Sequence, residues 1–492
     1  MKILLVYPET PATFWSFKDA LKFVSKKSAE PPLGLITIAA MLPKEWKKKL
    51  IDMNVSTLTD EDLLWADYVF LSAMNIHTRS VKEIIHRCNK LGTKIVAGGP
   101  LFTTQHQNFL GIDHFVLNEA EITLPLFIKD LESGTPKYLY TTDEFPDISA
   151  TPIPMWELLN MKKYASLSLQ YSRGCPYDCE FCSITMLNGR KPRTKSREQF
   201  LSELNRLFEL GYRGSISIVD DNFIGNKRKL KDLILPAIIN WQKEKKYPFN
   251  FITEVSINLS DDDELITLMV DAGITSIFVG IETPNDESLV ECGKSQNLKR
   301  NLLESVKKLQ RRGMLVSAGF IVGFDHDSPD IFSQQINFIE KSGIPSAMVG
   351  LLNAPSGTHL FNRLKNERRL LEGWSGNNMD GATNFIPKMN YRDLIAGYSK
   401  MIHVIYSPRE YYNRIQSFLD IYNVPSWKSQ ILTLTEIKAF FRLIWLIGVL
   451  EKGKRYFWKT FIYSLAKYPK KFSLAMTLTV YGYHFRRIAA TI

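Results

Sequence analysis

Short apolar runs alternate with amphipathic stretches along the first third of the chain. The runs cover residues 2–8, 49–54, 68–74, 94–100 and 114–119. Stretches between them, such as 81–91, carry apolar residues at helical spacing. Apolar strands that alternate with helices are typical of a parallel, doubly wound α/β sheet. We therefore expect a Rossmann-like domain over residues 1–140, with ligand contacts at the carboxyl ends of its strands.

A proline-rich segment and a second alternating series follow. Pro146, Pro152 and Pro154 favour an extended linker over residues 141–165. Beyond it, six further apolar runs alternate with helical stretches, and these runs are 166–171, 215–219, 249–254, 276–280, 315–322 and 346–352. Six βα units predict a partial (β/α)6 barrel over residues 166–360. The remaining residues, 361–492, are expected to form a mainly helical region.

Composition places the chain among ordinary folded proteins. Hydrophobic residues make up 45% and charged residues 23% of the 492 positions, which excludes a largely disordered, collagen-like or disulfide-rich chain. The first residues, MKILLVYPE, have the pattern of a strand and lack the features of a secretory signal. With five cysteines in the whole chain, we expect a protein of the reducing cytoplasm.

The net charge of +11 is unevenly distributed. Between residues 421 and 492 there are 12 lysines and arginines against two acidic residues, Glu436 and Glu451. Large aromatic residues are interleaved with these charges, and Arg442 leaves the apolar run 437–450 too short to span a bilayer. The pattern fits an interfacial helix on an anionic membrane, a nucleic-acid-binding surface, or a structural cap with a solvated basic face.

Three of the five cysteines form the run Cys175-Pro-Tyr-Asp-Cys179-Glu-Phe-Cys182, directly after the first expected barrel strand. Three thiolates at this spacing can hold one face of a [4Fe–4S] cluster and leave one iron open to a small chelating molecule. A structural zinc site would require a fourth ligand, and no further Cys or His is close in sequence. The run therefore predicts an iron–sulfur centre. Cys88 and Cys292 are expected to be structural thiols.

Together with the barrel pattern, this cysteine run resembles the radical S-adenosylmethionine (SAM) superfamily. The resemblance implies a barrel whose strand ends contact SAM at the open iron. At 219–223, where many members contact the methionine amino group, this chain has Asp-Asp in place of Gly-Gly-Glu. Taken singly, such residues are as readily helix caps or turn formers, but their succession on strand ends favours ligand contact. The expected SAM contacts are Phe181, Asp220, Asp221, Glu254, Gly280, Glu282, Gly323 and Phe324.

The order of a Rossmann-like domain and then this barrel resembles the cobalamin-binding-domain branch of the superfamily. Segments that match recurrent family segments include Pro31–Leu35 and Ala97–Pro100. The chain lacks the D-x-H-x-x-G segment that usually supplies a histidine to cobalt, although His77 lies near a strand end. The C-terminal part resembles hopanoid C2-methylases and archaeal tetraether-ring synthases. The resemblance implies cobalamin contacts at Ser72, Met74, Gly98, Gly99 and Glu119.

These resemblances imply a radical SAM enzyme, and two reactions stay open. One is cobalamin-dependent methylation, in which a 5′-deoxyadenosyl radical abstracts hydrogen from an unactivated carbon of an apolar, hopanoid or isoprenoid lipid and methylcobalamin delivers the methyl group. The other is ring or C–C bond formation in a lipid without methyl transfer. A third alternative is a non-catalytic iron–sulfur protein that binds RNA through its basic tail. The expected partners are a small-molecule or lipid substrate, a low-potential flavodoxin- or ferredoxin-type donor and the inner face of a membrane, rather than nucleic acid.

Overall fold

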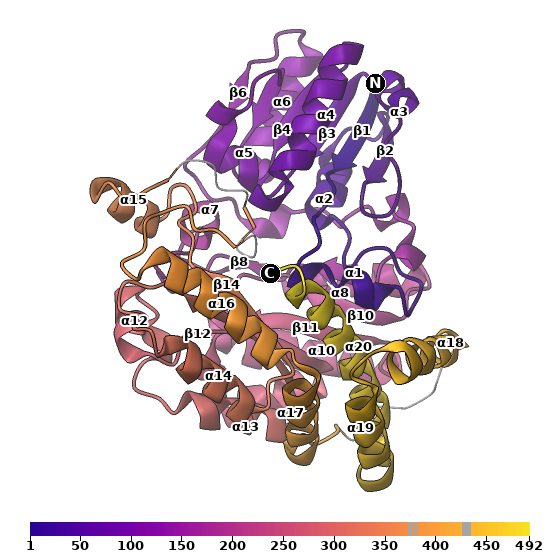
Figure 1. Cartoon of the computed structure of the whole chain (residues 1–492). Coiled ribbons are helices and arrows are strands. Elements are labelled where there is room, and N and C mark those ends of the chain that lie inside the picture. The colour runs from indigo at the N-terminus through magenta and orange to yellow at the C-terminus, as the bar shows by residue number, and fades with distance from the viewer. Residues whose placement is uncertain (372–375, 378–380, 426–433) are drawn as a thin grey trace.

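The computed structural model describes residues 1–371, 376, 377, 381–425 and 434–492. In Figure 1 the N-terminal part lies at the top, a barrel-like sheet lies beneath it, and the helices of the C-terminal part lie along the lower front of that sheet. This arrangement confirms the expected fold class: a Rossmann-like domain, a six-stranded (β/α) barrel and a mainly helical C-terminal region.

The N-terminal part is a six-stranded, wholly parallel sheet in the order β2-β1-β3-β4-β5-β6. The first strand pairs on both sides, with β2 at the edge and with β3, so that Leu5 lies opposite Leu50 and Phe70. Helices cover both faces of the sheet, which explains why its strands are apolar at successive positions. The strands are β1 (Lys2–Tyr7), β2 (Lys47–Asp52), β3 (Tyr68–Ser72), β4 (Lys94–Gly98), β5 (His114–Val116) and β6 (Leu139–Tyr140); the helices are α2 (Leu33–Met41), α3 (Asp60–Trp65), α4 (Thr78–Leu91), α5 (Pro100–Gln105) and α6 (Ala120–Glu132).

The central part is a second parallel sheet of six strands, in the order β14-β13-β12-β11-β10-β7. Its outer helices bury one set of strand side chains, whereas alternate residues of β11, β12 and β13 stay partly exposed on the inside. The barrel interior is therefore open. The strands are β7 (Ser166–Leu169), β10 (Gly214–Ile218), β11 (Phe249–Val255), β12 (Ile274–Glu282), β13 (Leu315–Val322) and β14 (Ser346–Leu351); the helices include α8 (Arg197–Glu209), α10 (Leu235–Glu244), α11 (Asp263–Asp271), α13 (Leu302–Arg311) and α14 (Ile331–Ser342).

The C-terminal helices complete the edge of this barrel. Tyr398 and Tyr406 donate their hydroxyls to the carbonyls of Val349 and Ala347, and so α16 lies on β14, every residue of which is buried. Within the described residues, no helix is both long and apolar enough to cross a membrane. The helices are α15 (His359–Asn366), α16 (Tyr391–Ile405), α17 (Pro408–Ile421), α18 (Leu434–Leu443), the π-helix η11 (Ile444–Leu450), α19 (Lys454–Lys467) and α20 (Phe472–Ala489).

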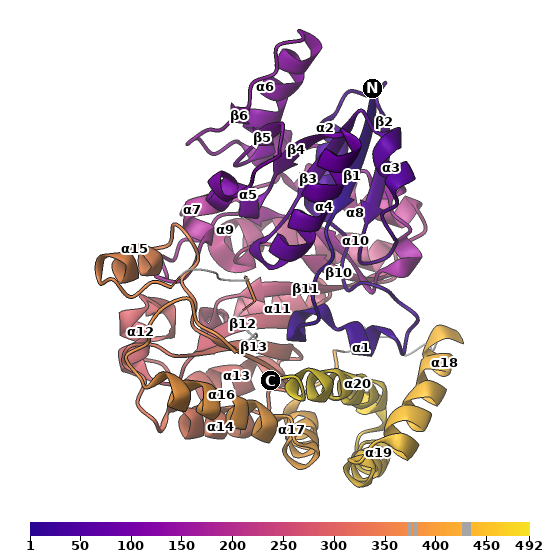
Figure 2. The ribbon, with the colours of Figure 1, turned by 45° about the horizontal axis from the view of Figure 1, so that its top comes forward.

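A segment of the N-terminal part reaches across to the far end of the chain. After β1, the short helices η1 (Phe14–Ser16) and α1 (Lys18–Leu21) leave the sheet and pack beside α20, as both ribbon views show (Figures 1 and 2). His484 on α20 is buried and its Nε2 donates to the carbonyl of Thr13 at 3.0 Å. We call residues 13–25 the insert, because they pass between the C-terminal helices and the barrel.

Candidate functional site

The cysteine loop lies between β7 and α8. Cys179 is buried, whereas Cys175 and Cys182 are half-buried. Burial raises the pKa of all three thiols, that of Cys182 to about 12, and their charges interact with one another. The thiols are therefore close together, and a metal that binds them must displace their protons.

The main chain of the loop donates to its sulfurs. Among the described residues, no three His, Cys, Asp or Glu side chains are grouped tightly enough to hold one metal ion. The main-chain N–H groups of Tyr177 and Ile184 are directed at the sulfurs of Cys175 and Cys182. Such N–H···S donors are typical of iron–sulfur sites.

Two aspartates that follow β10 hold this loop in place. Asp220, 2% exposed, accepts the N–H groups of Tyr171 and Ser172 at 2.7 and 2.8 Å and the Ser172 hydroxyl at 2.6 Å. Asp221 accepts the N–H of Gly174 at 2.8 Å, one residue before the first cysteine. The structure thus gives both aspartates, which were expected to contact SAM, a role in positioning the cysteine loop.

A buried lysine lies beside the three thiols. Lys294 Nζ is 2.6 Å from Glu282 Oε1 at the end of β12, and both side chains are largely buried. Burial lowers the pKa of Lys294, but the negative charges of Glu282 and Cys179 outweigh this and raise it above its ordinary value. Glu282 has φ +63°, a strained conformation for a residue other than glycine, and such strain clusters at functional sites. No motif in the sequence singled out Lys294.

An open cavity adjoins this ion pair. Its walls are mainly apolar, and the ring centroids of Trp15 from the insert and Phe278 from β12 are 4.6 Å apart. Gly280 and Glu282 line the cavity as well, which connects it to Lys294 and the thiols. The lining residues are Phe14, Trp15, Phe278, Gly280, Glu282, Gly319, Phe320, Ile321, Met348, Val349 and Gly350.

Two carboxylates face each other inside the barrel. Glu254, near the end of β11, is accessible to solvent but surrounded by protein, and burial together with the charges of Asp221 and Glu30 raises its pKa to about 7. Within the described residues, no hydrogen bond or ion pair involves the Glu254 side chain. Glu30 comes from the N-terminal part and accepts the hydroxyls of Ser217 and Ser168 on the barrel strands. Glu254 is thus left open to a cationic ligand.

The loop after β13 brings two predicted SAM contacts together. Asp327 accepts the N–H groups of Gly323 at 2.8 Å and Phe324 at 3.1 Å, and this carboxylate turns the chain where Gly323 has φ +106°. The ring of Phe324 lies 6.3 Å from the ring of Phe181 in the cysteine loop. Two aromatic side chains from separate loops therefore meet beside the thiols.

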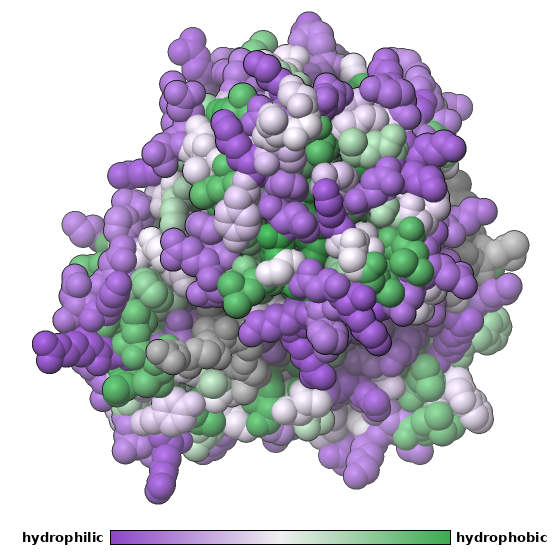
Figure 3. Space-filling model, turned by 90° about the horizontal axis from the view of Figure 1, so that it is seen from above, coloured by the Kyte–Doolittle hydropathy of each residue, from purple (hydrophilic) through white to green (hydrophobic). Residues whose placement is uncertain are grey.

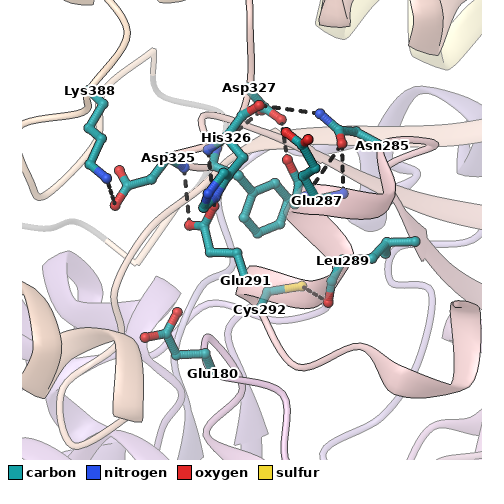
Figure 4. A network of polar contacts seen from close by, with 12 residues as sticks. Glu180, Asn285, Glu287, Leu289, Glu291, Cys292, Asp325, His326, Asp327 and Lys388 are labelled. Atoms are coloured by element: carbon teal, nitrogen blue, oxygen red, sulfur yellow. Dashed lines mark hydrogen bonds and ion pairs between the residues drawn. The ribbon is translucent and has the colours of Figure 1, made fainter.

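A network of carboxylates anchors this loop (Figure 4). Glu291 on α12 (Asp286–Glu291) accepts the N–H groups of Asp325 and His326, each at 3.0 Å. Arg363 on α15 pairs with Glu180, next to Cys179, at 2.6 Å and with Asp325 at 2.9 Å. The cysteine loop, the loop after β13 and the C-terminal part are thereby held as one unit.

His77, the histidine nearest to the end of β3, forms hydrogen bonds within the protein through both ring nitrogens. It is fully buried, and its Nδ1 accepts the N–H of Met74 at 3.1 Å. The proton is therefore on Nε2, which donates to the hydroxyl of Thr10 at 3.0 Å. Burial lowers the pKa of His77 to about 4. Both ring nitrogens are occupied, so His77 is not free to bind cobalt.

The predicted cobalamin contacts gather at the carboxyl ends of β3 and β4. A Cβ on Gly98 would lie 2.6 Å from the carbonyl of Val116, and a Cβ on Gly99, where φ is +88°, would lie 2.7 Å from Ser72 Oγ. Both glycines are thus required by the packing of the sheet itself. Met74 is 46% exposed beside them. In a sheet of this order the ligand site lies where the strand order reverses, between β1 and β3, and the open surface at Met74 fits that rule.

Glu119 connects the two sheets instead of standing free at a strand end. Its carboxylate is 2.7 Å from Arg173 and 2.6 Å from Arg193, and the Glu119 side chain is 6% exposed. Arg173 directly precedes the cysteine loop, and it also pairs with Glu121 at 2.9 Å. The carboxyl ends of the two sheets therefore face each other, fixed by buried ion pairs.

Comparison with known protein families divides the chain in the same way. Residues 24–128 match the B12 binding domain, residues 169–339 match the radical SAM superfamily, and residues 358–492 match a domain of unknown function (DUF4070). The first two matches carry with them a [4Fe–4S] cluster, SAM and cobalamin as cofactors. The cysteine loop, with its three thiols and its N–H donors, fits the cluster.

Similar proteins cover nearly the whole chain. An uncharacterized methyltransferase of Synechocystis sp. is 41% identical over 99% of this chain and 91% of its own length. The hopanoid C-2 methylase of Rhodopseudomonas palustris is 33% identical over 93% of this chain and 88% of its own. Among solved structures, the cobalamin-dependent radical enzyme OxsB, with aqua-cobalamin and SAM bound, has the same fold, with a TM-score of 0.62, 17% identity and coverage of 99% of this chain and 80% of its own.

Proposed function

The chain belongs to the cobalamin-binding radical SAM methyltransferases, and on this basis we propose that it methylates an unactivated carbon of an apolar, hopanoid- or isoprenoid-type lipid. One observation carries the choice of substrate. The cavity that leads to Glu282, Lys294 and the thiols has walls of aromatic and aliphatic side chains. Such walls favour the burial of an apolar molecule. As a member of this family the chain is an enzyme, and the alternative of a non-catalytic iron–sulfur protein is set aside.

The barrel residues divide the binding of the cluster and SAM among them. Cys175, Cys179 and Cys182 hold the cluster. Lys294, whose positive charge lies among the thiols and Glu282, pairs with the carboxylate of SAM. The open carboxylate of Glu254 pairs with a positively charged group. When bound, the cluster with SAM supplies a 5′-deoxyadenosyl radical that abstracts hydrogen, and cobalamin supplies the methyl group.

The remaining contacts shape the two ligand surfaces. Phe181 and Phe324 flank the adenine. Gly280 and Gly323 act through their neighbours, because a Cβ on Gly280 would lie 2.2 Å from Glu282 Oε1 and one on Gly323 would lie 3.4 Å from Leu394. The surface at Ser72 and Met74 receives the corrin, while Gly98 keeps the end of β4 close to β5 and Gly99 keeps it close to β3. Glu119 acts through Arg173 and Arg193, because these pairs hold the N-terminal sheet against the cysteine loop.

The relatives support a lipid substrate. The relative at 33% identity over 93% of this chain is a hopanoid C-2 methylase. In the cavity, Trp15 and Phe278 present ring faces against which a flat, fused-ring lipid would pack.

The experiment is an anaerobic assay of the reconstituted protein with cobalamin, a low-potential flavodoxin or ferredoxin donor and extracted membrane lipids. Methylation predicts a lipid heavier by one CH2 unit, because a methyl group replaces the abstracted hydrogen, together with equal amounts of 5′-deoxyadenosine and S-adenosylhomocysteine. Ring or C–C bond formation predicts a lipid lighter by two hydrogens, with 5′-deoxyadenosine and no S-adenosylhomocysteine. Phe278→Ala, which removes one wall of the cavity, is expected to uncouple SAM cleavage from lipid product. Methylation of a water-soluble molecule in preference to every lipid fraction would contradict the proposal.

A further inference from the structure

The hairpin formed by α18, η11 and α19 exposes an unusual number of apolar side chains. Of the 25 large hydrophobic residues that are exposed among the described residues, eight lie between positions 437 and 465. On the face that carries the N-terminal part, by contrast, polar side chains separate the hydrophobic groups (Figure 3). We call these eight residues the hairpin patch: Ile437, Phe441, Trp445, Val449, Leu450, Trp458, Ile462 and Leu465.

The patch follows from the geometry of the two helices. On the first arm, Ile437, Phe441, Trp445 and Val449 recur every four residues. In an α-helix of 3.6 residues per turn, residues four apart are slightly more than one turn apart, so the row that they form winds slowly around the axis. A π-helix has more residues per turn, so in η11 residues four apart are slightly less than one turn apart and the row winds back. The exposed residues therefore stay on one side of the arm. On α19, three patch residues also recur at helical spacing, and Trp458 Nε1 donates to the carbonyl of Gly448 in η11 at 2.9 Å. The stripes of the two arms are thus joined.

The other faces of the same helices are packed against the protein. Leu443, Ile447 and Phe457 are 3%, 0% and 0% exposed, and the rings of Phe440 and Phe461 meet between the arms at 6.2 Å. The hairpin is therefore a folded structural element with a second apolar face directed outward. Figures 1 and 2 show α18 and α19 projecting from the edge of the molecule.

Basic side chains surround the patch. Lys452, Lys454, Arg455 and Lys459 are exposed, and within the described residues no ion pair involves any of the four. The segment 421–492 has two acidic residues, and one of them, Glu451, pairs with Arg486 at 2.8 Å. An apolar face with an unneutralised basic border is complementary to an anionic bilayer. In a symmetric contact with a second copy, the same lysines would oppose one another.

We propose that the hairpin patch inserts into the interfacial region of an anionic membrane and holds the enzyme there. Trp445 and Trp458 would lie at the level of the lipid headgroups, as tryptophan does in membrane proteins. Arg442 on α18 donates to the carbonyls of Lys22 and Phe23 in the insert at 3.1 and 3.2 Å, and the same insert supplies Trp15 to the cavity wall. The membrane surface and the substrate cavity are thus connected through a few residues. Delivery of a lipid substrate along this path rests on the proposed function, whereas membrane binding itself does not.

The test is sedimentation of the full-length protein with vesicles of phosphatidylcholine, with and without phosphatidylglycerol. We expect binding to the anionic vesicles that weakens but persists at about 1 M salt, where the Debye length is about 3 Å. The variant Lys452→Gln/Lys454→Gln/Arg455→Gln/Lys459→Gln should bind anionic vesicles at least about 100-fold more weakly at low salt. Its matched control, Lys44→Gln/Lys47→Gln/Lys82→Gln/Lys90→Gln, makes the same change in charge at exposed lysines of the N-terminal part and should bind as the parent does.

The apolar part of the patch has its own variant and control. Phe441→Ser/Trp445→Ser/Ile462→Ser should abolish the binding that persists at high salt, whereas Leu64→Ser/Leu110→Ser/Val290→Ser, which changes exposed apolar residues elsewhere, should not. Equal binding to neutral and anionic vesicles, or no effect of the patch variant, would overturn the proposal. A parent protein that is dimeric by light scattering and becomes monomeric in the patch variant would also overturn it and assign the patch to self-association. Cleavage of SAM without lipid should be the same in the patch variant, so a failure of membrane binding is distinguishable from a failure of the proposed chemistry.

Discussion

The carboxyl ends of the two parallel sheets face each other, but the polar side chains at the two ends differ in whether they have partners within the protein. At the end of the N-terminal sheet, His77 is bound at both ring nitrogens and Glu119 is paired with two arginines. At the end of the barrel sheet, Glu254 has no partner among the described residues and Lys294 stands among three thiols and a carboxylate. At the N-terminal edge the polar side chains have their partners within the protein. At the barrel edge, partners for the polar side chains remain to be supplied by the proposed ligands.

The difference indicates how the work is divided between the sheets. A satisfied edge is a rigid support for a large preformed cofactor, and its residues act by shape. An unsatisfied edge stores electrostatic free energy that small charged ligands release on binding. Substitutions at the barrel edge should therefore affect chemistry, and they should affect folding as well where they break a buried pair such as Lys294–Glu282. Substitutions at the N-terminal edge should affect mainly folding.

The largest effect is expected at the cysteine loop. Cys179→Ala removes a thiolate ligand and should abolish reductive SAM cleavage, measured as 5′-deoxyadenosine, and iron uptake should fall below about four per chain. Cys88→Ala, in the core of the N-terminal part, should retain both. Full SAM cleavage by the Cys179→Ala protein would contradict the assignment of the cysteine loop as the site of the cluster.

A second effect separates chemistry from stability at Lys294. Lys294→Met leaves Glu282 buried without its partner, and should lower the free energy of unfolding by about 3–5 kcal/mol, measured by urea denaturation. Adding Glu282→Gln should restore much of this stability but not SAM cleavage. Lys195→Met is the matched control, because Lys195 and Glu203 form another buried ion pair, with side chains 4% and 0% exposed. If the Lys195→Met protein lost SAM cleavage to the same extent when folded, Lys294 would have no special place in the site.

A third effect concerns folding alone and belongs to the N-terminal edge. The pKa of His77 is about 4 in the folded protein and about 6.5 in an unfolded chain. Between these values the unfolded state binds more protons, so the free energy of unfolding should fall by up to about 3 kcal/mol as the pH drops from 6.5 to 4. His77→Gln should remove this component, and His86→Gln, at an exposed position of α4, should retain it. If the free energy of unfolding had the same pH dependence in the parent, His77→Gln and His86→Gln proteins, the pKa of His77 would not be lowered by folding.

The smallest effect is expected at Glu254. Its pKa of about 7 implies that the fraction of negative carboxylate grows as the pH rises through neutrality. Cleavage at low SAM concentration should then rise by about tenfold or less across this range, with an inflection that Glu254→Gln removes. Glu287→Gln, an exposed change on α12, is the control. An unchanged inflection in the Glu254→Gln protein would assign the titration to another group.

Much of the fold was predictable because the buried strand residues form short apolar runs, on both faces of the N-terminal sheet and on the outer face of the barrel strands. All six barrel strands and five of the six N-terminal strands lie where the apolar runs placed them, as β13 does at Leu315–Val322. The two-residue strand β6 was missed, because so short a segment has no periodicity to detect. The π-helix η11 was missed too, since its apolar residues suit an α-helix equally well.

The cysteine loop could be recognised from local spacing, because the run needs only eight consecutive residues. Its role as the ligand of a cluster stays a prediction. Lys294 and Trp15 were missed because each acquires its place through tertiary packing, one next to Glu282 and the other through the insert. Asp220 illustrates the opposite case, since a strand-end position that matches a ligand motif serves to hold the neighbouring loop.

The contact between the insert and α20 has a consequence for synthesis on the ribosome. The hydrogen bond from His484 to Thr13 joins residues 471 positions apart, and at about 5–20 residues per second the two emerge roughly half a minute to a minute and a half apart. During that time Phe14 and Phe17 have no α20 to pack against, and the wall of the cavity is incomplete. The cavity wall is therefore complete only after translation has passed α20, and a chain truncated before this point should be recognised by chaperones through its exposed insert.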